Sequence, residues 1–454
     1  RIANFLKERK LSLNEINDFF VLETRKPWSE IAESEKGMIL SLLGGKNNQI
    51  ITSQSVFISP KKGIQSPWSS KVKDIFLKCG IDLLNIEKLN SYSFSKETDL
   101  NFEDLSFLFD PLTEEVILEL AKIQELFSVP NKKISREIEC TTKDSFIKAN
   151  KDLNLGLNEY EINYLFLGLK DIERKVQDSE LMMFSQINSE HCRHKIFNSN
   201  WNGLDKVDEG KSLFSMIKDT YRNHSENVLS AYSDNAAVIE GFGESRFFPD
   251  PNSKKYKNLK EGNNFCIKVE THNHPTAIAP FPGAATGSGG EIRDEGATGR
   301  GAKPKAGLCG FSVSHLRIPN QIESWEGKEN KPKRISSPLE IMIEAPVGAA
   351  SFNNEFGRPN ILGYFRSFEK YDEKNKTHSG FHKPIMIAGG IGNIRPSHTH
   401  KNKVKKTAKI VVLGGPGYLI GLGGGSASST ETGSSEEALD FASVQRSNPE
   451  MQRR

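Results

Sequence analysis

The strongest constraint on the fold is a short apolar run that ends in chemically active side chains. The run Phe265-Cys-Ile-Lys-Val269 is rich in β-branched and aromatic residues and predicts a buried strand. Its C-terminal end carries Glu270, His272 and His274. Ligands bind at the carboxyl ends of strands in open α/β sheets. The pattern therefore predicts an α/β domain with a functional site at this end of the strand.

A glycine-rich segment follows, with the sequence Gly283-Ala-Ala-Thr-Gly-Ser-Gly-Gly-Glu-Ile-Arg-Asp294. Its glycines permit positive φ and let backbone N–H groups approach an anion, so we expect a phosphate-binding loop. No stretch has the pattern G-x-G-x-x-G, and Gly210-Lys-Ser212 lacks the upstream glycine of a P-loop. A P-loop kinase and a Rossmann dehydrogenase are therefore disfavoured.

Charged residues surround this expected loop. Glu270 and Asp294 are hard oxygen ligands, and Mg²⁺ in nucleotide sites is usually held by one or two carboxylates and the substrate phosphates. Lys268 and Arg293 add the positive charge that a triphosphate needs. Ordinary surface ion pairs are the alternative interpretation. The clustering favours a nucleotide site with magnesium.

The two histidines of this segment alternate with Asn273. On extended backbone this spacing puts the rings of His272 and His274 on one face, and Pro275 would end the strand. A lone histidine is more often structural. Two beside a metal carboxylate favour one that acts on the substrate and one that orients it.

Length and charge bound the class of protein. The chain has 454 residues, a formal net charge of +3 and 26% charged residues, which predicts two to four soluble domains. No apolar run approaches a spanning helix, and charges throughout the first residues exclude a signal peptide. The basic run 401–409 is interpreted as a solvated loop. Without a concentrated basic face interleaved with aromatics, a nucleic-acid module is disfavoured.

Five cysteines occur at irregular spacing, namely Cys79, Cys140, Cys192, Cys266 and Cys309. An odd number in a large chain favours reduced thiols in the cytosol over a disulfide framework. Two of them, Cys192 and Cys309, could form a zinc site with His191, His194, His272 and His274. Since no C-x-x-C occurs, structural zinc from this set is disfavoured.

The first 130 residues alternate between strand and helix patterns without a chemical motif. A strand is expected at 50–58, a helix capped by Ser69 before Gly80, and a second helix capped by Thr113. Residues 130–200 are helical and polar, with a capping box at Asn158-x-x-Glu161. This segment ends in Ser189-Glu-His-Cys-Arg-His-Lys195, which has more polar side chains than a linker needs.

The remaining residues alternate between strands, glycine-rich loops and helices. Strands are expected at 236–241, 265–270, 307–316, 339–345 and 384–389. From about residue 405, a buried strand at 409–415, a second glycine loop at 421–429 and a helix at 435–445 predict the start of another domain. Because the chain begins with Arg1 and ends at Arg454 on a helical pattern, we expect it to be an internal piece of a longer protein.

Several long motifs together resemble phosphoribosylformylglycinamidine synthase of the large, glutamine-dependent type. They are Ser66-Pro-Trp-Ser-Ser70, Ser189-Glu-His-Cys-Arg-His-Lys195, Val269-Glu-Thr-His-Asn-His-Pro275, the segment 283–300, Gly421-Leu-Gly-Gly-Gly-Ser426 and Asp440-Phe-Ala-Ser-Val-Gln-Arg446. The resemblance implies an α+β and α/β multidomain fold. It places a small α+β domain at 1–135, a helical linker at 136–196, and the first half of a duplicated aminoimidazole-ribonucleotide-synthetase-like core at 197–404 and 405–454.

The resemblance also implies the reaction. ATP phosphorylates the amide oxygen of formylglycinamide ribonucleotide, and ammonia derived from glutamine displaces phosphate to give the amidine, a step of purine biosynthesis. ATP and Mg²⁺ are the implied cofactors, the location is cytoplasmic, and no nucleic acid or membrane partner is implied. The second core repeat and the glutaminase domain are expected in cis, so this piece alone should be inactive with glutamine.

Site residues follow from the same resemblance. His272 corresponds to the catalytic base and His191 to a second essential histidine. The implied nucleotide-binding residues are Lys268, Gly283, Ala284, Ala285, Thr286, Gly287, Ser288, Gly289, Gly290, Glu291, Ile292, Arg293, Asp294, Gly363, Tyr364 and Phe365. The implied substrate residues are Thr271, Asn273, His274 and Arg293, and the implied metal ligands are Glu270 and Asp294. Whether this nucleotide site is catalytic or auxiliary stays open.

Two other interpretations compete. Related ATP-dependent enzymes, such as aminoimidazole ribonucleotide synthetase and selenophosphate synthetase, lack the N-terminal module and the Ser189–Lys195 motif. A non-catalytic nucleotide-binding scaffold would keep the glycine segments but tolerate loss of His191 or His272, and both are present.

Overall fold

The chain divides into two units. The computed structural model describes residues 13–45, 55–62, 65–94, 105, 108–110, 113–128, 135–153, 155–172, 174–201, 210–250, 252–327, 331–332, 334–413, 421, 423–429, 440, 443–445 and 449–453. The first unit comprises the described residues of Arg1–Ile134, and the second those of Ser135–Gly414 and Leu419–Arg454. No helix among the described residues is long and apolar enough to cross a membrane.

The first unit is a small sheet with helices packed on it. Four antiparallel strands lie in the order β1-β3-β2-β4, with β1 at Leu13–Thr24, β2 at Ser55–Pro60, β3 at Leu83–Phe94 and β4 at Glu114–Ile117. The helices are η1 (Trp28–Glu30), α2 (Glu33–Leu43), α3 (Pro67–Lys78) and α4 (Leu120–Ile123). Ile39 of α2 and Phe76 of α3 form a core with Ile86 of β3. The predicted α+β character is confirmed.

Two local predictions in this unit are wrong. Ser66 rather than Ser69 caps α3, because the Ser66 hydroxyl accepts the Ser69 N–H at 3.1 Å and Pro67 begins the helix. The residues after Thr113 form β4 instead of a helix, since they pair with the free edge of β2. The predicted end of α3 is confirmed, because Gly80 has φ +82°.

The second unit begins with a cluster of helices. They are α5 (Lys143–Asp152), α6 (Glu159–Leu169), α7 (Asp178–Asn188) and α8 (Glu190–Arg193), with the short strands β5 (Glu137–Ile138) and β6 (Val176–Gln177) paired beside them. The predicted capping box is confirmed, because Asn158 and Glu161 each accept the other's backbone N–H. Ile162, Leu165 and Leu181 pack in one apolar cluster.

A six-stranded sheet forms the body of this unit, in the order β11-β10-β14-β9-β8-β7. Its strands are β7 (Val228–Ser230), β8 (Ala237–Pro249), β9 (Tyr256–Thr271), β10 (Lys303–Val313), β11 (Asn360–Ser367) and β14 (Ile385–Ile394). Only β10 and β11 are parallel. The expected strands at 236–241, 265–270, 307–316 and 384–389 are confirmed. The expected open α/β sheet is wrong, because most neighbouring strands run antiparallel.

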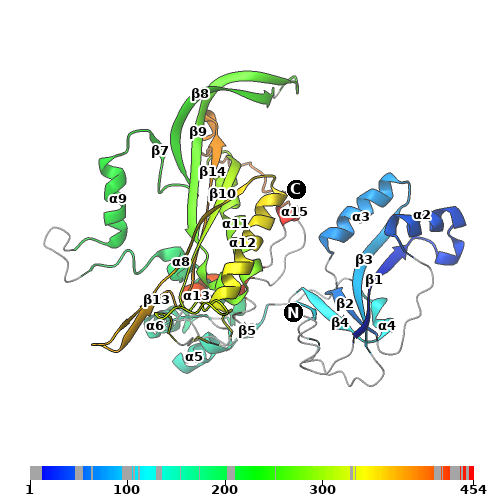
Figure 1. The fold of residues 1–454 in the computed structure, drawn as a ribbon, viewed down its shortest axis with the longest axis horizontal. Helices are drawn as coiled ribbons and strands as arrows, with labels where there is room; N and C mark the ends of the chain where they lie inside the picture. Colours follow the sequence, from blue (N-terminus) through cyan, green and yellow to red (C-terminus); the bar gives the residue numbers. More distant parts are fainter. Residues whose placement is uncertain are drawn as a thin grey trace. The chain divides into compact units, whose positions relative to one another are not determined.

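Two long helices, α11 (Pro280–Ala297) and α12 (Pro338–Glu355), pack together and cover one face of the sheet (Figure 1). The residues expected as a strand at 339–345 lie in α12. Ala284 of α11 and Ala345 of α12 join Phe311 and Met386 of the sheet in a fully buried core. Small residues on both helices let them approach the sheet closely.

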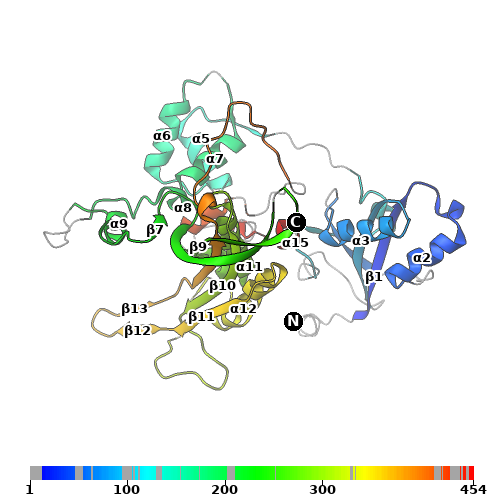
Figure 2. The ribbon, with the colours of Figure 1, turned by 90° about the horizontal axis from the view of Figure 1, so that it is seen from above.

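Shorter elements complete the second unit. They are α9 (Leu213–Asn223), α10 (Asn273–Ile278), η3 (Pro396–His398), α13 (Gly424–Ser429), α15 (Pro449–Arg453) and a hairpin of β12 (Glu369–Asp372) with β13 (Thr377–Gly380). Figures 1 and 2 show this hairpin extending from the end of the sheet.

The segment after residue 400 agrees with expectation in its first part and differs after it. The basic run 401–409 is exposed and has no helix or strand, as predicted. Residues 409–413 were expected in a buried strand, but Ile410 is 95% exposed and no described strand pairs with this segment. Most of the helix expected at 435–445 lies outside the described residues. All five cysteines are unpaired, as predicted.

Candidate functional site

The glycine-rich segment is not a loop. Residues 283–294 lie within α11, and Gly283, Gly287, Gly289 and Gly290 do not have positive φ. The expected loop conformation is therefore wrong. A β-carbon at Gly283 would lie 2.3 Å from the Pro275 carbonyl oxygen, and one at Gly287 would lie 3.0 Å from His272 Cβ. These glycines let α11 pack against the segment that carries the two histidines.

Other residues of this segment are accounted for by packing. Ala284 lies in the core with Phe311, and Ala285 and Ile292 pack with Phe352. Thr286, Ser288 and Glu291 are also buried. The carboxylate of Glu291 forms an ion pair with the Arg358 guanidinium. The nucleotide-binding role expected for these residues stays a prediction, and all of them are buried in the interior of the unit.

A charged cluster lies where β9 faces α11. Lys268 and Glu270 are two residues apart on β9 and share a face. The Lys268 ammonium lies 2.7 Å from Asp294 Oδ2 and 3.5 Å from Glu270 Oε2. A β-carbon at Gly290 would lie 2.7 Å from Glu270 Oε1 and 3.5 Å from Arg293 Nη2. All four predicted charged residues are therefore neighbours.

Burial sets the electrostatics of this cluster. It raises the pKa of Glu270, which the charge of Asp294 raises further and Lys268 only partly offsets. Burial lowers the pKa of Arg293. It would also lower the pKa of Lys268, but the contacts with Asp294 and Glu270 raise it overall. Because two carboxylates share one small region, the oxygen donors fit a divalent cation such as Mg²⁺.

The two histidines do not share a face. Strand β9 ends at Thr271, His272 is the N-cap of α10, and Pro275 lies inside that helix. The strand expected through Pro275 is therefore wrong. The His274 ring is buried, with Nε2 3.3 Å from the Ser443 hydroxyl and 3.8 Å from Asp440 Oδ1. His272 lies against α11 instead.

His272 is held by β14 and keeps a free ring nitrogen. Its backbone N–H donates to the Met386 carbonyl at 2.9 Å, and the Met386 N–H donates to Asn273 Oδ1 at 2.9 Å. Within the described structure, His272 Nε2 is buried without a hydrogen-bond partner. Burial lowers the pKa of His272 to about 4, helped by the charges of Arg293, His191 and His274. The ring is therefore neutral at neutral pH, as a general base must be.

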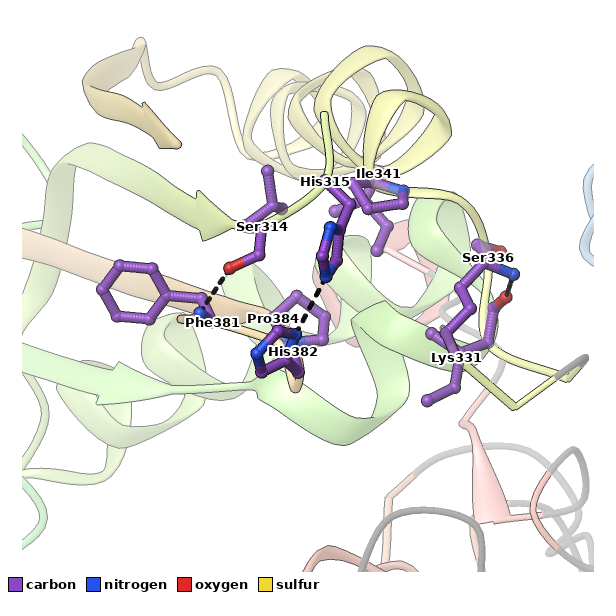
Figure 3. Close-up of a pocket in the computed structure, with 11 residues that line it drawn as sticks. Ser314, His315, Lys331, Ser336, Ile341, Phe381, His382 and Pro384 are labelled. Atoms are coloured by element: carbon purple, nitrogen blue, oxygen red, sulfur yellow. Dashed lines mark hydrogen bonds between the residues drawn. The ribbon is translucent and has the colours of Figure 1, made fainter. Parts of the chain in front are cut away.

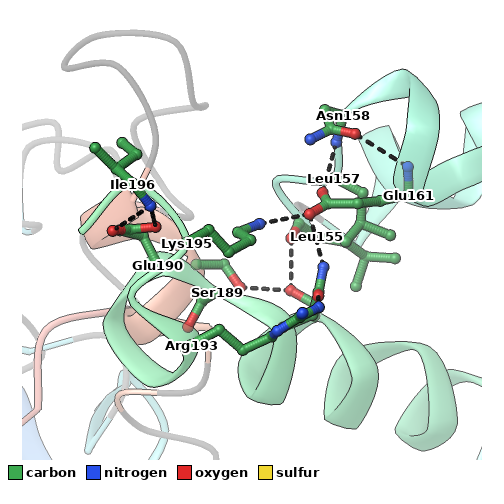
Figure 4. Close-up of polar contacts among 12 residues, drawn as sticks. Leu155, Leu157, Asn158, Glu161, Ser189, Glu190, Arg193, Lys195 and Ile196 are labelled. Carbon is green, nitrogen blue, oxygen red and sulfur yellow. Dashed lines mark hydrogen bonds and ion pairs between the residues drawn. The ribbon is translucent and has the colours of Figure 1, made fainter. Parts of the chain in front are cut away.

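The second predicted histidine, His191, lies on α8, and polar contacts anchor the surrounding motif (Figure 4). Glu161 of α6 accepts from Asn188 Nδ2 at 2.7 Å and from Lys195 Nζ at 2.5 Å. Arg193 Nη1 donates to Asn188 Oδ1 at 2.7 Å. The charged residues of the motif thus fix α8, whereas the His191 side chain stays exposed.

The second glycine motif packs beside this helix. Helix α13 contacts α7, α8 and α10. Gln186 of α7 accepts from the Gly425 N–H at 3.2 Å and donates to the Ser426 hydroxyl at 2.8 Å. Lys383 Nζ donates to the Ser428 carbonyl at 3.1 Å. Three motifs that are distant in the sequence therefore meet, carried by α8, α10 and α13.

The residues predicted on β11 lie apart from this cluster. Gly363, Tyr364 and Phe365 occupy the edge strand, and β10 and β14 separate them from β9. Phe365 stacks on Phe311 with ring centroids 5.8 Å apart. Thr271 is exposed at the end of β9. The fold therefore does not bring the β11 residues together with Lys268 and Glu270.

Sequence reasoning missed several partners of the site. Asp440 lies near His274 and also 2.6 Å from Arg334 Nε. Gln452 of α15 accepts from Arg293 Nη1 at 2.6 Å and donates to the Gly289 carbonyl at 3.2 Å. Asp440 stood in a recognised motif, but no sequence signal linked it to His274, 166 positions earlier.

Comparisons with known proteins assign two segments. Residues 18–127 match the formylglycinamide ribonucleotide amidotransferase N-terminal family, and residues 146–195 match the formylglycinamide ribonucleotide amidotransferase linker domain. The two matches together cover about a third of the chain. The predicted resemblance to the N-terminal portion of this enzyme is confirmed.

Solved structures with similarity to the chain include PurL of Thermotoga maritima complexed with FGAR, at 22% identity and a TM-score of 0.38. The match covers 64% of this chain and 35% of that protein, so the chain spans about a third of its relative's length. The same protein complexed with ATP matches at 23% identity and a TM-score of 0.28, over 52% of this chain and 27% of that one. Thiamine monophosphate kinase from Aquifex aeolicus matches at 14% identity and a TM-score of 0.20, over 42% and 44%.

Proposed function

We propose that the protein containing this chain is a phosphoribosylformylglycinamidine synthase, an ATP-dependent ligase of purine biosynthesis. It converts formylglycinamide ribonucleotide and ammonia derived from glutamine to the amidine, with release of ADP and phosphate. The matches of residues 18–127 and 146–195 to the formylglycinamide ribonucleotide amidotransferase families support this assignment. The observation that carries it is the neutral His272 ring, whose Nε2 is buried and unpartnered within the described structure, beside Arg293.

The chemistry requires a base and stabilisation of a phosphoryl group. His272 Nε2 can accept the proton that ammonia loses as the C–N bond forms, because a neutral imidazole has a free lone pair. Lys268 and Arg293 supply positive charge for phosphate oxygens. His191 lies close enough to lower the pKa of His272, and it is the proposed second essential histidine.

Glu270 and Asp294 are the proposed Mg²⁺ ligands. Magnesium held by these two carboxylates would supply positive charge to offset that of the phosphate oxygens during phosphoryl transfer. Lys268 contacts both carboxylates, so it would keep them in place before nucleotide binds. Asn273 contacts the Met386 N–H and His274 the Ser443 hydroxyl, and these contacts hold α10 in place. Thr271 and Arg293 remain the residues proposed to meet substrate.

The proposal includes the wider organisation of the enzyme. The proposed domain limits are 1–135, 136–196, 197–404 and 405–454, with a second core repeat and a glutaminase domain supplied by the rest of the protein. The five free thiols support a cytoplasmic location. The 454-residue piece alone should release no ADP in a glutamine-dependent manner.

The test compares full-length wild type with His272→Ala and His272→Gln. ADP formation that depends on both formylglycinamide ribonucleotide and ammonium chloride is measured, and ATP binding is followed separately. The exposed His224→Ala serves as the matched control. Loss of turnover of about 10²-fold or more in both His272 variants, with ATP binding retained, supports the proposal. Unchanged turnover would show that His272 is structural, and ATP binding without turnover in wild type would indicate a scaffold.

A further inference from the structure

A second group of histidines lies at the base of the β12–β13 hairpin, outside the residues considered above. His315 follows β10, His378 lies on β13, and His382 precedes β14. One ring nitrogen from each lies within 4.8 Å of the others. His315 Nε2 is 3.1 Å from His382 Nδ1, and Figure 3 shows these two rings pointing toward each other. Three imidazoles therefore converge on one point.

The spacing of the nitrogens suits a metal ion. Zinc binds histidine nitrogen at about 2.0–2.1 Å, so two ligands of a tetrahedral ion lie about 3.3 Å apart. The separation of 3.1 Å between His315 Nε2 and His382 Nδ1 is close to this value. The His378 nitrogen lies within 4.8 Å of the other two, so a shift of its ring is needed to complete a three-nitrogen site.

A buried carboxylate supports the rings from behind. The Glu369 side chain is fully buried, and its Oε2 lies 3.1 Å from His315 Nδ1. Glu369 Oε1 lies 3.5 Å from His378 Nε2. The carboxylate also accepts the backbone N–H groups of His315, at 2.7 Å, and of Gly327. Histidines that bind metals typically donate their other ring N–H to a carboxylate, which fixes the tautomer. His315 Nδ1 lies close to Glu369 without forming a hydrogen bond to it, and His315 Nε2 faces His382.

The three imidazoles would leave the fourth position of a tetrahedral ion to another ligand. His315 is 6% exposed, whereas His382 is exposed, so the cluster has a buried side and an accessible side. A pocket lined by Ser314, Lys331, Ser336 and Phe381 adjoins both rings (Figure 3). Three protein ligands with an open fourth position is an arrangement that zinc adopts with a bound water.

We propose that His315, His378 and His382 bind a Zn²⁺ ion, with Glu369 orienting two of the rings. Imidazole nitrogen favours zinc and its neighbours in the first transition series, whereas Mg²⁺ and Ca²⁺ prefer oxygen. The ion joins the hairpin to the ends of β10 and β14. His378-Ser-Gly-Phe-His382 has the H-x₃-H spacing of many zinc sites. The site is independent of the function proposed above.

Zinc binding to the full-length, tag-free protein tests the proposal. The protein is stripped with a chelator and titrated with Zn²⁺ against a chromophoric chelator, and the bound metal is counted by mass spectrometry. Wild type should bind one more zinc ion per chain than the triple variant His315→Ala/His378→Ala/His382→Ala. Equal stoichiometry in wild type and triple variant would overturn the site.

Single variants separate metal binding from folding. His382→Ala removes an exposed ring and should weaken zinc binding at least 10-fold, whereas the matched control His224→Ala should leave it unchanged. Glu369→Gln should weaken binding about 10- to 100-fold. Zinc should raise the melting temperature of wild type and of His224→Ala but not of His382→Ala. Unchanged zinc affinity in His382→Ala would contradict the proposal.

Discussion

Gly289 of α11 packs directly against the ring of Phe352 on α12. A β-carbon at Gly289 would lie 2.6 Å from Phe352 Cζ and 2.8 Å from its Cε2. The ring is 1% exposed and stacks on Phe356 with centroids 5.7 Å apart, so it has little freedom to move. Gly289 therefore sets how closely the two helices approach.

Gly289→Ala should destabilise the protein by about 1–3 kcal/mol, because the added methyl group overpacks a closed core. The matched control is Gly296→Ala on the same helix, where a β-carbon would meet nothing within 4 Å. That substitution should stabilise the protein by up to about 1 kcal/mol through helix propensity. Urea unfolding of both variants checks the pair. Equal effects of the two substitutions would show that Gly289 is not under packing constraint.

The glycine segment shows what the sequence could and could not predict. The glycine content of residues 283–294 predicted a loop. Glycine is equally suited to close packing between helices, so composition alone does not separate the two. What distinguishes a loop glycine from a packing glycine is the set of atoms that it contacts. Here those atoms belong to Pro275, His272 and Phe352. Local signals were more reliable where the contact itself is local, as in the capping box of Asn158 and Glu161.

The sequence predicted which residues lie in the site better than it predicted how the helices and strands place them. Lys268, Glu270 and Asp294 were expected near one another, and they are, because β9 and α11 lie close in the sequence as well as in space. The residues 339–345 were expected in a strand because apolar runs suit either a strand or a buried helix. His315 and His382 were missed because 67 positions separate them and only the return of β14 beside β10 brings them together.

His272 predicts a distinctive dependence of activity on pH. Its pKa is about 4 in the folded protein, below the ordinary value of 6.5, so the ring stays neutral throughout the range from pH 6 to 8. The rate of ADP formation, corrected for the fraction of free ammonia, should not fall as pH drops from 8 to 6. A fall of the wild-type rate with a midpoint near pH 6.5 would contradict this value.

The same shift affects stability. The unfolded chain binds a proton on His272 below pH 6.5, whereas the folded protein does so only near pH 4. The neutral ring therefore makes its full contribution to the free energy of unfolding above pH 6.5. This contribution decreases as pH falls from 6.5 to 4. His272→Gln should lose this part of the pH dependence, which thermal melts from pH 4 to 8 measure.

Glu295 predicts an effect of opposite sign. Both its carboxylate oxygens are buried and lack hydrogen-bond partners in the described structure. Burial raises its pKa to about 9, and the neighbouring Glu291 adds to the effect. The folded protein thus keeps a proton that the unfolded chain loses above about pH 4.5. Stability should fall as pH rises from 4.5 to 9.

Glu295→Gln should remove this dependence, because the amide is neutral at every pH. Its melting temperature should exceed that of wild type at pH 8.5 and approach it at pH 5. The comparison is Glu291→Gln, which removes the closer carboxylate partner of the buried Arg358 guanidinium and leaves Glu295 Oε1 at 3.9 Å, so it should destabilise the protein at both pH values. A Glu295→Gln variant less stable than wild type at pH 8.5 would show that Glu295 is ionised.

Glu161 links the linker helices to the proposed catalytic histidine. Burial alone would raise the pKa of Glu161, but its hydrogen bonds from Lys195, Asn158 and Asn188 lower it overall. Glutamine at this position keeps the capping box but loses the charge that holds Lys195, so α8 should move relative to α13. Because small displacements of a reacting group are costly, Glu161→Gln should lower turnover about 10- to 100-fold.

The control is Glu159→Gln, at an exposed residue of the same helical turn. The turnover of this variant should match wild type. Equal turnover in both variants, with His191→Ala inactive, would show that His191 needs no support from Glu161.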